Sequence, residues 1–265
     1  MEINIEELTP MMQKYMETKQ EYKDCILFYR LGDFYEMFFE DALTASRELE
    51  ITLTGKSCGL KERAPMCGVP FHAVEGYLNK LVSKGYKVAI CEQVEDPKQA
   101  KGLVKREVTR IVTPGTNLDT YALDETKNNY IMCIVYVDNK YGVSVADVTT
   151  GAYFVTELDS ERKLLDEISK YMPSEIISNE AFFMSGIDLA DLRHRLGITI
   201  YSLESWYFGD DLAATTLKEH FHVASLDGLG LGDYNCGVIA AGSLLKYLYE
   251  TQKTTLDHMT TIEPY

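Results

Sequence analysis

Three short apolar segments in the second half of the chain place the strongest constraint on its fold. Residues 130–137, 141–147 and 152–158 are rich in β-branched and aromatic side chains, which favour strands. Turn-forming residues at 138–140 and 149–151 separate the three segments. Short apolar runs joined by tight turns are typical of antiparallel strands that follow one another in a sheet. The sequence therefore predicts an antiparallel meander.

The remainder of the second half alternates helices with short strands. Apolar residues recur at helical spacing before Pro173, and short apolar segments follow at 175–178 and 198–201. A long apolar helix is predicted from about residue 234 to residue 252. A meander followed by helix–strand alternation favours an α/β layer fold of the ribonuclease H type.

The first half of the chain also combines strand-like and helical patterns. The apolar run at 25–29 predicts a buried strand that ends at Leu31-Gly32. Asp33 then has the position of a helix N-cap, which places Phe34 where the predicted helix begins. The buried face of this helix is predicted from the spacing of Phe38, Ala42, Ala45 and Leu49.

Residues 51–112 are predicted to contain strands around a long loop and a helix. Residues 51–53 are predicted as a strand, and 54–70 as a loop because it contains three glycines and two prolines. Strands are also predicted at 87–91 and at 104–112. The sequence thus predicts an α/β fold with two domains, of which the first contains a mixed sheet.

The charge of the chain is distributed unevenly between its two halves. Residues 1–115 carry 16 Lys and Arg and 18 Asp and Glu, a net charge of −2. Residues 116–265 carry 10 and 23, a net charge of −13, which gives −15 for the whole chain. Turn residues at 113–116 and a polar stretch that follows predict a linker over 116–128. The nearly neutral half is suited to contact with phosphate, and the acidic half is not.

The composition argues against membrane and metal-binding classes. No apolar run is long enough to span a bilayer, and the acidic N-terminus does not resemble a signal peptide, so a cytoplasmic protein is expected. None of the six cysteines forms a Cys-x-x-Cys pair, and we expect all six to be reduced and structural. His220 and His222 have no further ligand nearby, which favours a solvated helix end over a metal site.

Five segments of the chain carry motifs in a definite order. The second of them contains Gly32-Asp33-Phe34-Tyr35-Glu36, with a Phe-x-Glu motif at Phe34 and Glu36. On these residues the chain resembles the MutS family over its whole length, and five ordered segments are more specific than one short motif. The segments are 9–15, 32–38, 66–73, 88–93 and 110–116.

The resemblance implies a domain organisation and a set of partners. Residues 1–115 correspond to the mismatch-recognition domain, 129–250 to a ribonuclease H-like connector domain, and 251–265 to the start of a core or lever domain. No phosphate-binding Gly-x-x-x-x-Gly-Lys-Ser/Thr motif is present, so we expect no enzyme activity and no cofactor in this chain. In the family, ATP and Mg belong to a later part of the protein. The resemblance further implies mismatched or looped duplex DNA as ligand, a homodimer, a MutL-type repair partner bound through the connector, and a nucleoid-associated location.

The resemblance implies that Phe34 wedges into DNA and that Glu36 hydrogen-bonds the displaced base. A mispaired step is weakly stacked, so inserting an aromatic ring there costs less than at a paired step. A carboxylate repels phosphate, so it penalises DNA that offers it no hydrogen-bond donor. A structural interpretation stays open, in which Asp33 and Glu36 form a capping box and Phe34 packs on Phe38.

Five cations in the first half are candidates for contact with the DNA backbone. Such contacts position a protein on DNA without reading its sequence. The alternative for each of these side chains is a solvated surface charge. The candidates are Lys56, Arg63, Lys105, Arg106 and Arg110.

Two other functions remain as alternatives for the second half. A ribonuclease H-like fold could be a metal-dependent nuclease, but the predicted strand 130–137 contains no acidic residue. Asp147 ends the next strand and also fits the role of a turn cap. The other alternative is a module that only binds proteins, for which the net charge of −13 would suit a basic partner.

Overall fold

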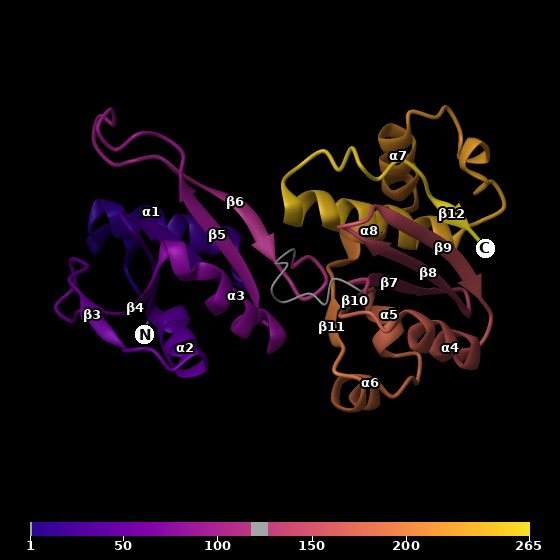
Figure 1. Ribbon diagram of the computed structural model, residues 1–265, viewed down its shortest axis with the longest axis horizontal. Coiled ribbons are helices and arrows are strands. Elements are labelled where there is room, and N and C mark those ends of the chain that lie inside the picture. Colours follow the sequence, from indigo (N-terminus) through magenta and orange to yellow (C-terminus); the bar gives the residue numbers. More distant parts are fainter. Residues whose placement is uncertain (1, 118–126) are drawn as a thin grey trace. The chain divides into compact units, whose positions relative to one another are not determined.

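The computed structural model describes residues 2–117 and 127–265, and divides the chain into two compact units (Figure 1). The first unit ends at Thr113 and the second begins at Pro114. Each unit contains one six-stranded mixed sheet with helices on both faces. The predicted two-domain α/β fold is therefore confirmed. No helix among the described residues is long and apolar enough to cross a membrane.

The sheet of the first unit has the strand order β3-β4-β2-β1-β5-β6. Only β1 and β5 pair in parallel, and the other neighbours are antiparallel. The strands are β1 (Cys25–Leu31), β2 (Phe34–Phe38), β3 (Thr54–Lys56), β4 (Ala64–Pro70), β5 (Lys87–Gln93) and β6 (Arg106–Val112). The loop between β5 and β6 extends beyond the sheet (Figure 1).

Three α-helices cover the two faces of this sheet. The helices α2 and α3 pack on one face, against side chains such as Tyr35, Met37 and Val88. The helix α1 packs on the other face, where its Tyr15 contacts Tyr29 and Phe38. These helices are α1 (Pro10–Glu21), α2 (Phe39–Leu49) and α3 (Val74–Ser83), and short 3-10 turns lie at η1 (Ile5–Glu7) and η2 (Phe71–Ala73).

Residues 34–38 form a strand, so the prediction that Asp33 caps a helix beginning at Phe34 is wrong. β2 lies between β1 and β4, and Glu36 is opposite Tyr29 on one side and Gly68 on the other. Hydrogen bonding to two neighbouring strands outweighs the helical spacing of the apolar residues. The helix begins only after β2, at Phe39, whose φ of 54° turns the chain out of the sheet.

The segment from residue 51 to residue 70 also differs from its prediction. Residues 51–53 lie outside the sheet, and the segment 54–70 forms the hairpin of β3 and β4 instead of a loop. Glycine and proline disfavour strands, but β4 pairs with β3 at one end and with β2 at the other, and so joins the sheet despite Pro65 and Gly68. The prediction of strands at 87–91 and 104–112 is confirmed by β5 and β6.

The sheet of the second unit has the strand order β11-β10-β7-β8-β9-β12. β7, β8 and β9 are consecutive antiparallel neighbours, which confirms the predicted meander. β10 and β11 continue the sheet in parallel beside β7, and β12 pairs in parallel with β9. The strands are β7 (Ile131–Val137), β8 (Lys140–Asp147), β9 (Ala152–Leu158), β10 (Glu175–Ser178), β11 (Thr199–Ser202) and β12 (Glu263–Pro264).

Helices cover both faces of the second sheet (Figure 1). The long apolar helix α8 and the helix α7 pack on one face, and the shorter helices α4, α5 and α6 pack on the other. These helices are α4 (Glu161–Tyr171), α5 (Glu180–Phe183), α6 (Leu189–Arg195), α7 (Asp210–Phe221) and α8 (Cys236–Gln252), with 3-10 turns η3 (Ser205–Phe208) and η4 (Leu226–Leu229).

The closing residues pack on the second unit. Leu256, Met259 and Ile262 are buried in the same core as α8, and β12 follows them. The expectation that residues 251–265 begin a further domain stays a prediction, as do the boundaries 1–115 and 129–250. The expected linker 116–128 falls largely on residues outside those that the structure describes.

All six cysteines are free and buried, in agreement with the prediction that they are reduced and structural. Burial raises the pKa of four of these thiols, Cys25, Cys67, Cys91 and Cys236, to about 12. Burial also raises the pKa of Cys133.

Candidate nucleic-acid interface

Phe34 is an exposed aromatic ring at the start of β2. A two-residue turn joins β1 to β2, and Gly32 adopts a φ of +61° in it, which glycine tolerates without strain. Phe34 is paired with Leu31 across this turn and with Pro70 on the other side. Its exposed fraction is 47%, which is unusual for an aromatic residue in an interior strand. The backbone is held on both sides while the ring faces solvent.

Exposure increases along one face of β2 from its end to its start. Side chains alternate between the faces of a strand, so Phe34, Glu36 and Phe38 share the face that α1 covers. Phe38 is 1% exposed because it packs against Tyr15, with the ring centroids 4.9 Å apart. Glu36 is half-buried, and Phe34 is exposed. We call the part of this face that carries Phe34 and Glu36 the open face.

Glu36 is held on the open face by an ion pair. Its Oε2 accepts a hydrogen bond from Nζ of Lys56 at 2.9 Å, and 17% of the Glu36 side chain and 35% of the Lys56 side chain are exposed. Lys56 ends β3, and Nζ lies 5.7 Å from the centroid of the Phe38 ring. β4 lies between β2 and β3, so this ion pair bridges three strands.

Gly68 contributes no side chain to the open face at the point opposite Glu36. A Cβ built there would lie 3.5 Å from Cγ of Glu36 and 3.9 Å from Cδ1 of Phe34. The space beside both candidate residues therefore depends on a glycine. The sequence contained this residue in the segment 66–73, but nothing in its local pattern indicated that it faces Glu36.

The structure brings two of the five candidate cations to the side of Phe34. Lys56 contacts Glu36 directly. Arg106 lies over Tyr29, with its guanidinium 5.2 Å from the ring centroid, and its Nε donates to the carbonyl of Arg30 at 2.6 Å. Tyr29 belongs to the core on the α1 side of the sheet, so Arg106 is on the same side as the open face.

The other three candidate cations lie elsewhere on the first unit. Arg110 pairs with Glu75 of α3 at 3.6 Å, on the opposite face of the sheet. Gly55 precedes Lys56 in β3, so a Cβ built on Gly55 would point to the face opposite to that of Lys56. The Cβ of Arg63 lies 3.1 Å from that position, so Arg63 is also on the face opposite to Lys56. Lys105 lies in the β5–β6 loop, where its Nζ is 3.0 Å from Glu107.

Arg30 forms a cluster that the sequence did not reveal. Its guanidinium stacks on Phe71 at 3.9 Å from the ring centroid, and its Nη1 is 3.3 Å from Oε2 of Glu92. Burial raises the pKa of Glu92, and the nearby Arg30 partly opposes that shift. Phe71 is 38% exposed. The three residues come from η2 and from the ends of β1 and β5, and no short-range pattern links them.

In the second unit, Asp147 acts as a turn cap. Its Oδ1 accepts hydrogen bonds from the backbone N of Thr149 at 2.9 Å and from the Thr149 hydroxyl, as in a turn closed by an aspartate side chain. Asp147 is fully buried, and its Oδ2 has no hydrogen-bond partner among the described residues. Within residues 2–117 and 127–265, no group of three or more His, Cys, Asp or Glu is placed to bind a metal.

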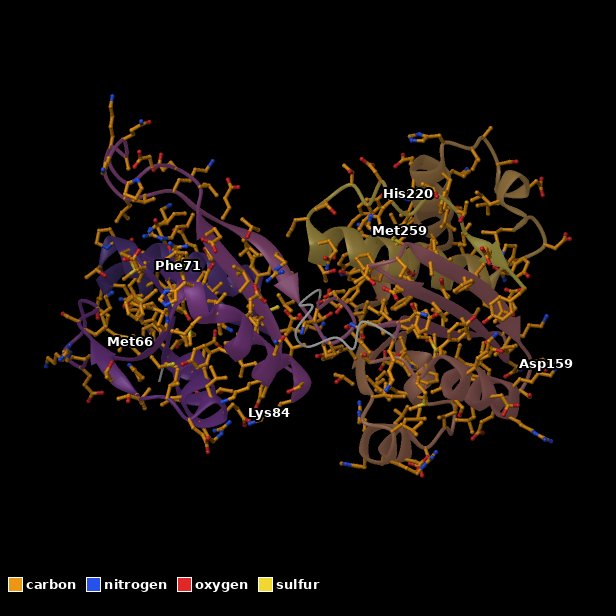
Figure 2. All side chains as sticks on the ribbon, in the orientation of Figure 1. Met66, Phe71, Lys84, Asp159, His220 and Met259 are labelled. Carbon is orange, nitrogen blue, oxygen red and sulfur yellow. The ribbon has the colours of Figure 1, made fainter. Side chains whose placement is uncertain are left out.

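His220 and His222 lie at the end of α7, as predicted, with His222 exposed and His220 half-buried beside a cavity. The Nε2 of His220 lies 2.6 Å from the carbonyl oxygen of Met259, and its Nδ1 contacts the hydroxyl of Tyr249. His220 and Met259 are labelled in Figure 2. A carbonyl only accepts, so Nε2 carries the proton and the Tyr249 hydroxyl donates to Nδ1. The cavity has a volume of about 550 Å³ and is lined by α7, the end of α8 and residues 255–260. The segment 255–260 is distant in sequence, which is why the pattern around His220 did not indicate it.

Comparison with known families covers almost the whole chain. Residues 9–121 match MutS domain I, and residues 129–260 match MutS domain II. A protein of Lachnoclostridium phytofermentans named DNA mismatch repair protein MutS is 66% identical over 259 residues, which are 98% of this chain and 28% of that protein. Proteins of the same name from Acetivibrio thermocellus and Alkaliphilus metalliredigens are 52% and 49% identical over 97% of the chain.

The chain spans between 28% and 30% of the length of these relatives. The matches to the two domains follow one another along the sequence, as the two compact units do in the structure. The chain therefore belongs to the MutS family and comprises its domains I and II.

Proposed function

We propose that the first unit recognises a mispaired or unpaired base in duplex DNA, with Phe34 as the wedge and Glu36 as the hydrogen-bond acceptor for the displaced base. The observation that carries this proposal is the open face of β2, where an exposed ring lies two residues from an anchored carboxylate. The relatives of this chain are named as DNA mismatch repair proteins, which supports DNA as the ligand.

The position of Phe34 suits insertion into a base stack. The ring extends from a strand that is paired on both sides, so little conformational entropy is lost when it is ordered against DNA. Stacking of an aromatic ring on a base contributes about 1–3 kcal/mol. The cost of unstacking is lower at a mismatch than at a paired step, and this difference provides discrimination without base-specific contacts.

The position of Glu36 suits rejection of paired DNA. An ionised carboxylate only accepts hydrogen bonds and is repelled by phosphate. It is therefore unfavourable in contact with a paired duplex, and it becomes favourable where a displaced base presents a donor. Gly68 leaves room beside Glu36 and Phe34 for such a base.

We assign the second unit a role as a connector. Its net charge of −13 disfavours contact with DNA and leaves its surface to proteins. The partner in this proposal is a MutL-type repair protein, and the unit relays DNA binding to an ATPase that uses ATP and Mg in a later part of the protein. A homodimer of that longer protein would work in the cytoplasm, in association with the nucleoid. We propose no catalytic role for either unit, and the turn contacts of Asp147 give no support to a nuclease.

The proposal is tested by binding to a duplex with one unpaired thymine and to its fully paired counterpart at low salt. Binding is measured by fluorescence anisotropy with the chain itself. It is also measured with a chimera in which the chain replaces the matching residues of the Lachnoclostridium phytofermentans relative. Phe34→Ala should lose about 1–3 kcal/mol of binding to the unpaired-thymine duplex and bind the paired duplex as before. A matched control is Trp206→Ala, which removes an equally exposed ring, 50% exposed, from the second unit.

Loss of the preference for unpaired thymine in Phe34→Ala, with Trp206→Ala unchanged, would support the wedge. A chimera that binds both duplexes equally, or a Phe34→Ala variant that keeps the preference, would show that Phe34 has no role in recognition.

A further inference from the structure

The ion pair between Lys56 and Glu36 has a geometry that a simple phosphate contact would not need. Lys56 is on β3 and Glu36 on β2, with β4 between them, and yet Nζ and Oε2 are 2.9 Å apart. Both side chains are largely shielded from solvent, which limits screening of the pair by water and salt. A cation that only contacted phosphate would not need a carboxylate as its partner.

The backbone of Lys56 is fixed from two directions. Lys56 pairs with Ala64 in the β3–β4 hairpin. Directly after it, the carbonyl of Cys58 accepts a hydrogen bond from the backbone N of Thr9 at 2.9 Å, and the Cys58 side chain is fully buried. Gly59 packs so closely on the N-terminal segment that a Cβ there would lie 2.5 Å from the carbonyl oxygen of Glu7. The hairpin thus presents the ammonium group at a defined place.

The positive charge of Lys56 offsets the repulsion between the Glu36 carboxylate and the phosphates of DNA. A lone carboxylate beside the wedge would be repelled by every phosphate that approaches, whether the duplex is paired or mismatched. A cation in contact with Oε2 offsets that repulsion, and it fixes the rotamer of Glu36 so that the second oxygen, Oε1, can face an incoming base. Gly68 lies on β4 between the two residues and has no side chain there, so Lys56 can reach Glu36 across β4.

We infer that Lys56 is a positioning residue that sets mismatch discrimination through Glu36, and does not act as an independent contact to the DNA backbone. This inference rests on the proposed function, because it concerns how Glu36 works at the same site. It assigns Lys56 a role different from that of the other candidate cations. It also predicts that the effects of changing the two residues depend on each other.

The inference is tested by a double-mutant cycle with Lys56→Gln and Glu36→Gln. The quantity compared is the discrimination ratio, the dissociation constant for the paired duplex divided by that for the duplex with one unpaired thymine. Lys56→Gln should lower this ratio at least five-fold in the wild-type background and less than two-fold in the Glu36→Gln background. Lys56→Arg restores a cation within reach of Glu36 and should keep the ratio within two-fold of wild type.

Arg63→Gln is the matched control for the loss of one positive charge. Arg63 belongs to the same hairpin and lies on the side opposite to Lys56, so its removal should leave the ratio unchanged in both backgrounds. Thermal unfolding of each variant shows whether the hairpin is intact. The restoration by Lys56→Arg separates a role of the charge from a loss of structure.

The inference would be overturned if Lys56→Gln weakened binding to both duplexes by the same factor, with the same effect in both Glu36 backgrounds. That result would make Lys56 an ordinary phosphate contact. Phe34→Ala, measured in parallel, separates this failure from a failure of the proposed function. If Phe34→Ala loses the preference while the cycle is additive, only the inference about Lys56 is wrong.

Discussion

At the scale of single residues, the proposed recognition site depends on which side chains are absent as well as on which are present. Phe34 and Glu36 are accompanied on β4 by Gly68, which has no side chain to occupy the space beside them. The φ of Gly68 is not positive, so its backbone conformation is open to other residues. A substitution at this position can therefore close the open face without breaking the strand.

Gly68→Val is expected to abolish the preference for an unpaired thymine and to leave the protein folded. A β-branched residue suits a strand, and the one tight contact of its Cβ would be 3.3 Å from the backbone oxygen of Tyr35, so the variant should fold with a modest fall in unfolding temperature. The added methyl groups would fill the space between Glu36 and Phe34. The measurement is the discrimination ratio together with the unfolding temperature.

Gly76→Ala provides the control for this variant. Gly76 is an exposed position in α3 with open space around its Cα, and alanine there should stabilise the helix by about 0.5–1 kcal/mol without affecting DNA binding. Full discrimination in a folded Gly68→Val variant would mean that the base does not enter the space beside Glu36.

Local sequence could not predict the exposure of Phe34, because Phe34 and Phe38 are spaced as two core residues of a helix would be. Resemblance to the MutS family identified Phe34 and Glu36, and the structure supplied their placement on a strand. Lys56 and Glu36 were each identified, but their contact was not, because they are 20 residues apart and are joined across β4. Only the order of the strands in the sheet reveals that pair.

At the scale of elements, strands were predicted correctly where tight turns flank them. They were missed where glycine and proline, which usually indicate turns, occur within a strand. The meander β7–β9 was predicted because turn residues separate its three apolar runs. β2 was mistaken for a helix start, although its buried and exposed residues alternate as in a strand, because Asp33 has the appearance of an N-cap. Its two neighbours in the sheet determine its conformation: β1 pairs with it in a local hairpin, and β4 pairs with it over a long sequence separation.

Glu157 links two elements of the second unit by capping the start of α8. Its Oε2 accepts hydrogen bonds from the backbone N of Gly237 at 2.7 Å and of Asn235 at 2.9 Å. Burial alone would raise the pKa of Glu157, but these hydrogen bonds and one from the Cys236 thiol outweigh it, so the pKa is lowered. A carboxylate at a helix N-terminus is also favoured by the helix dipole.

Glu157→Gln is expected to destabilise the second unit by about 1 kcal/mol at pH 7, a value reduced for solvent screening because Glu157 is only half-buried. A lowered pKa stabilises the folded state above the unfolded pKa, and this contribution is lost as the pH falls through the folded pKa. The difference between wild type and variant should therefore shrink below about pH 5. The measurement is urea unfolding followed by the fluorescence of Trp206, the single tryptophan.

Glu161→Gln, at an exposed position in the first turn of α4, serves as the control for Glu157→Gln. It should change the free energy of unfolding by less than about 0.5 kcal/mol. A difference between Glu157→Gln and wild type that stays constant from pH 7 to pH 4 would contradict a role for the carboxylate charge.

At the scale of the whole molecule, the two units differ in net charge, and the candidate cations of the first unit are divided between the two faces of its sheet. The boundary between the units falls at Thr113 and Pro114, two residues before the predicted boundary at residue 115. Residues 114 and 115 carry no charge, so the units keep the net charges of −2 and −13 that were counted from the sequence. Within the first unit, Lys56 and Arg106 share the side of Phe34, and Arg110 lies on the other. The uneven charge along the chain can be read from the sequence, whereas the face on which each cation lies follows only from the arrangement of the strands in the sheet.

Arg106→Gln should weaken binding to the paired and the unpaired-thymine duplex equally, and should reduce the dependence of log affinity on log salt by about one unit. Arg110→Gln, four residues along the same strand but on the opposite face, should change neither affinity. Lys163→Gln tests the second unit in the same way, because Lys163 is exposed on α4. Equal effects of all three variants would show that binding reflects net charge and not a defined side.

The burial of the thiols has a practical consequence for experiments that attach probes to this protein. The thiolate is the form that reacts with a maleimide, and a raised pKa leaves little of it at neutral pH. Five of the six buried thiols have a raised pKa and the sixth, Cys58, is fully buried, so the native cysteines should react little with such a probe. A cysteine introduced at an exposed position, such as Met184→Cys at a residue that is 81% exposed, would react selectively. A fluorophore or spin label could thus be attached at a chosen site while every native cysteine is retained.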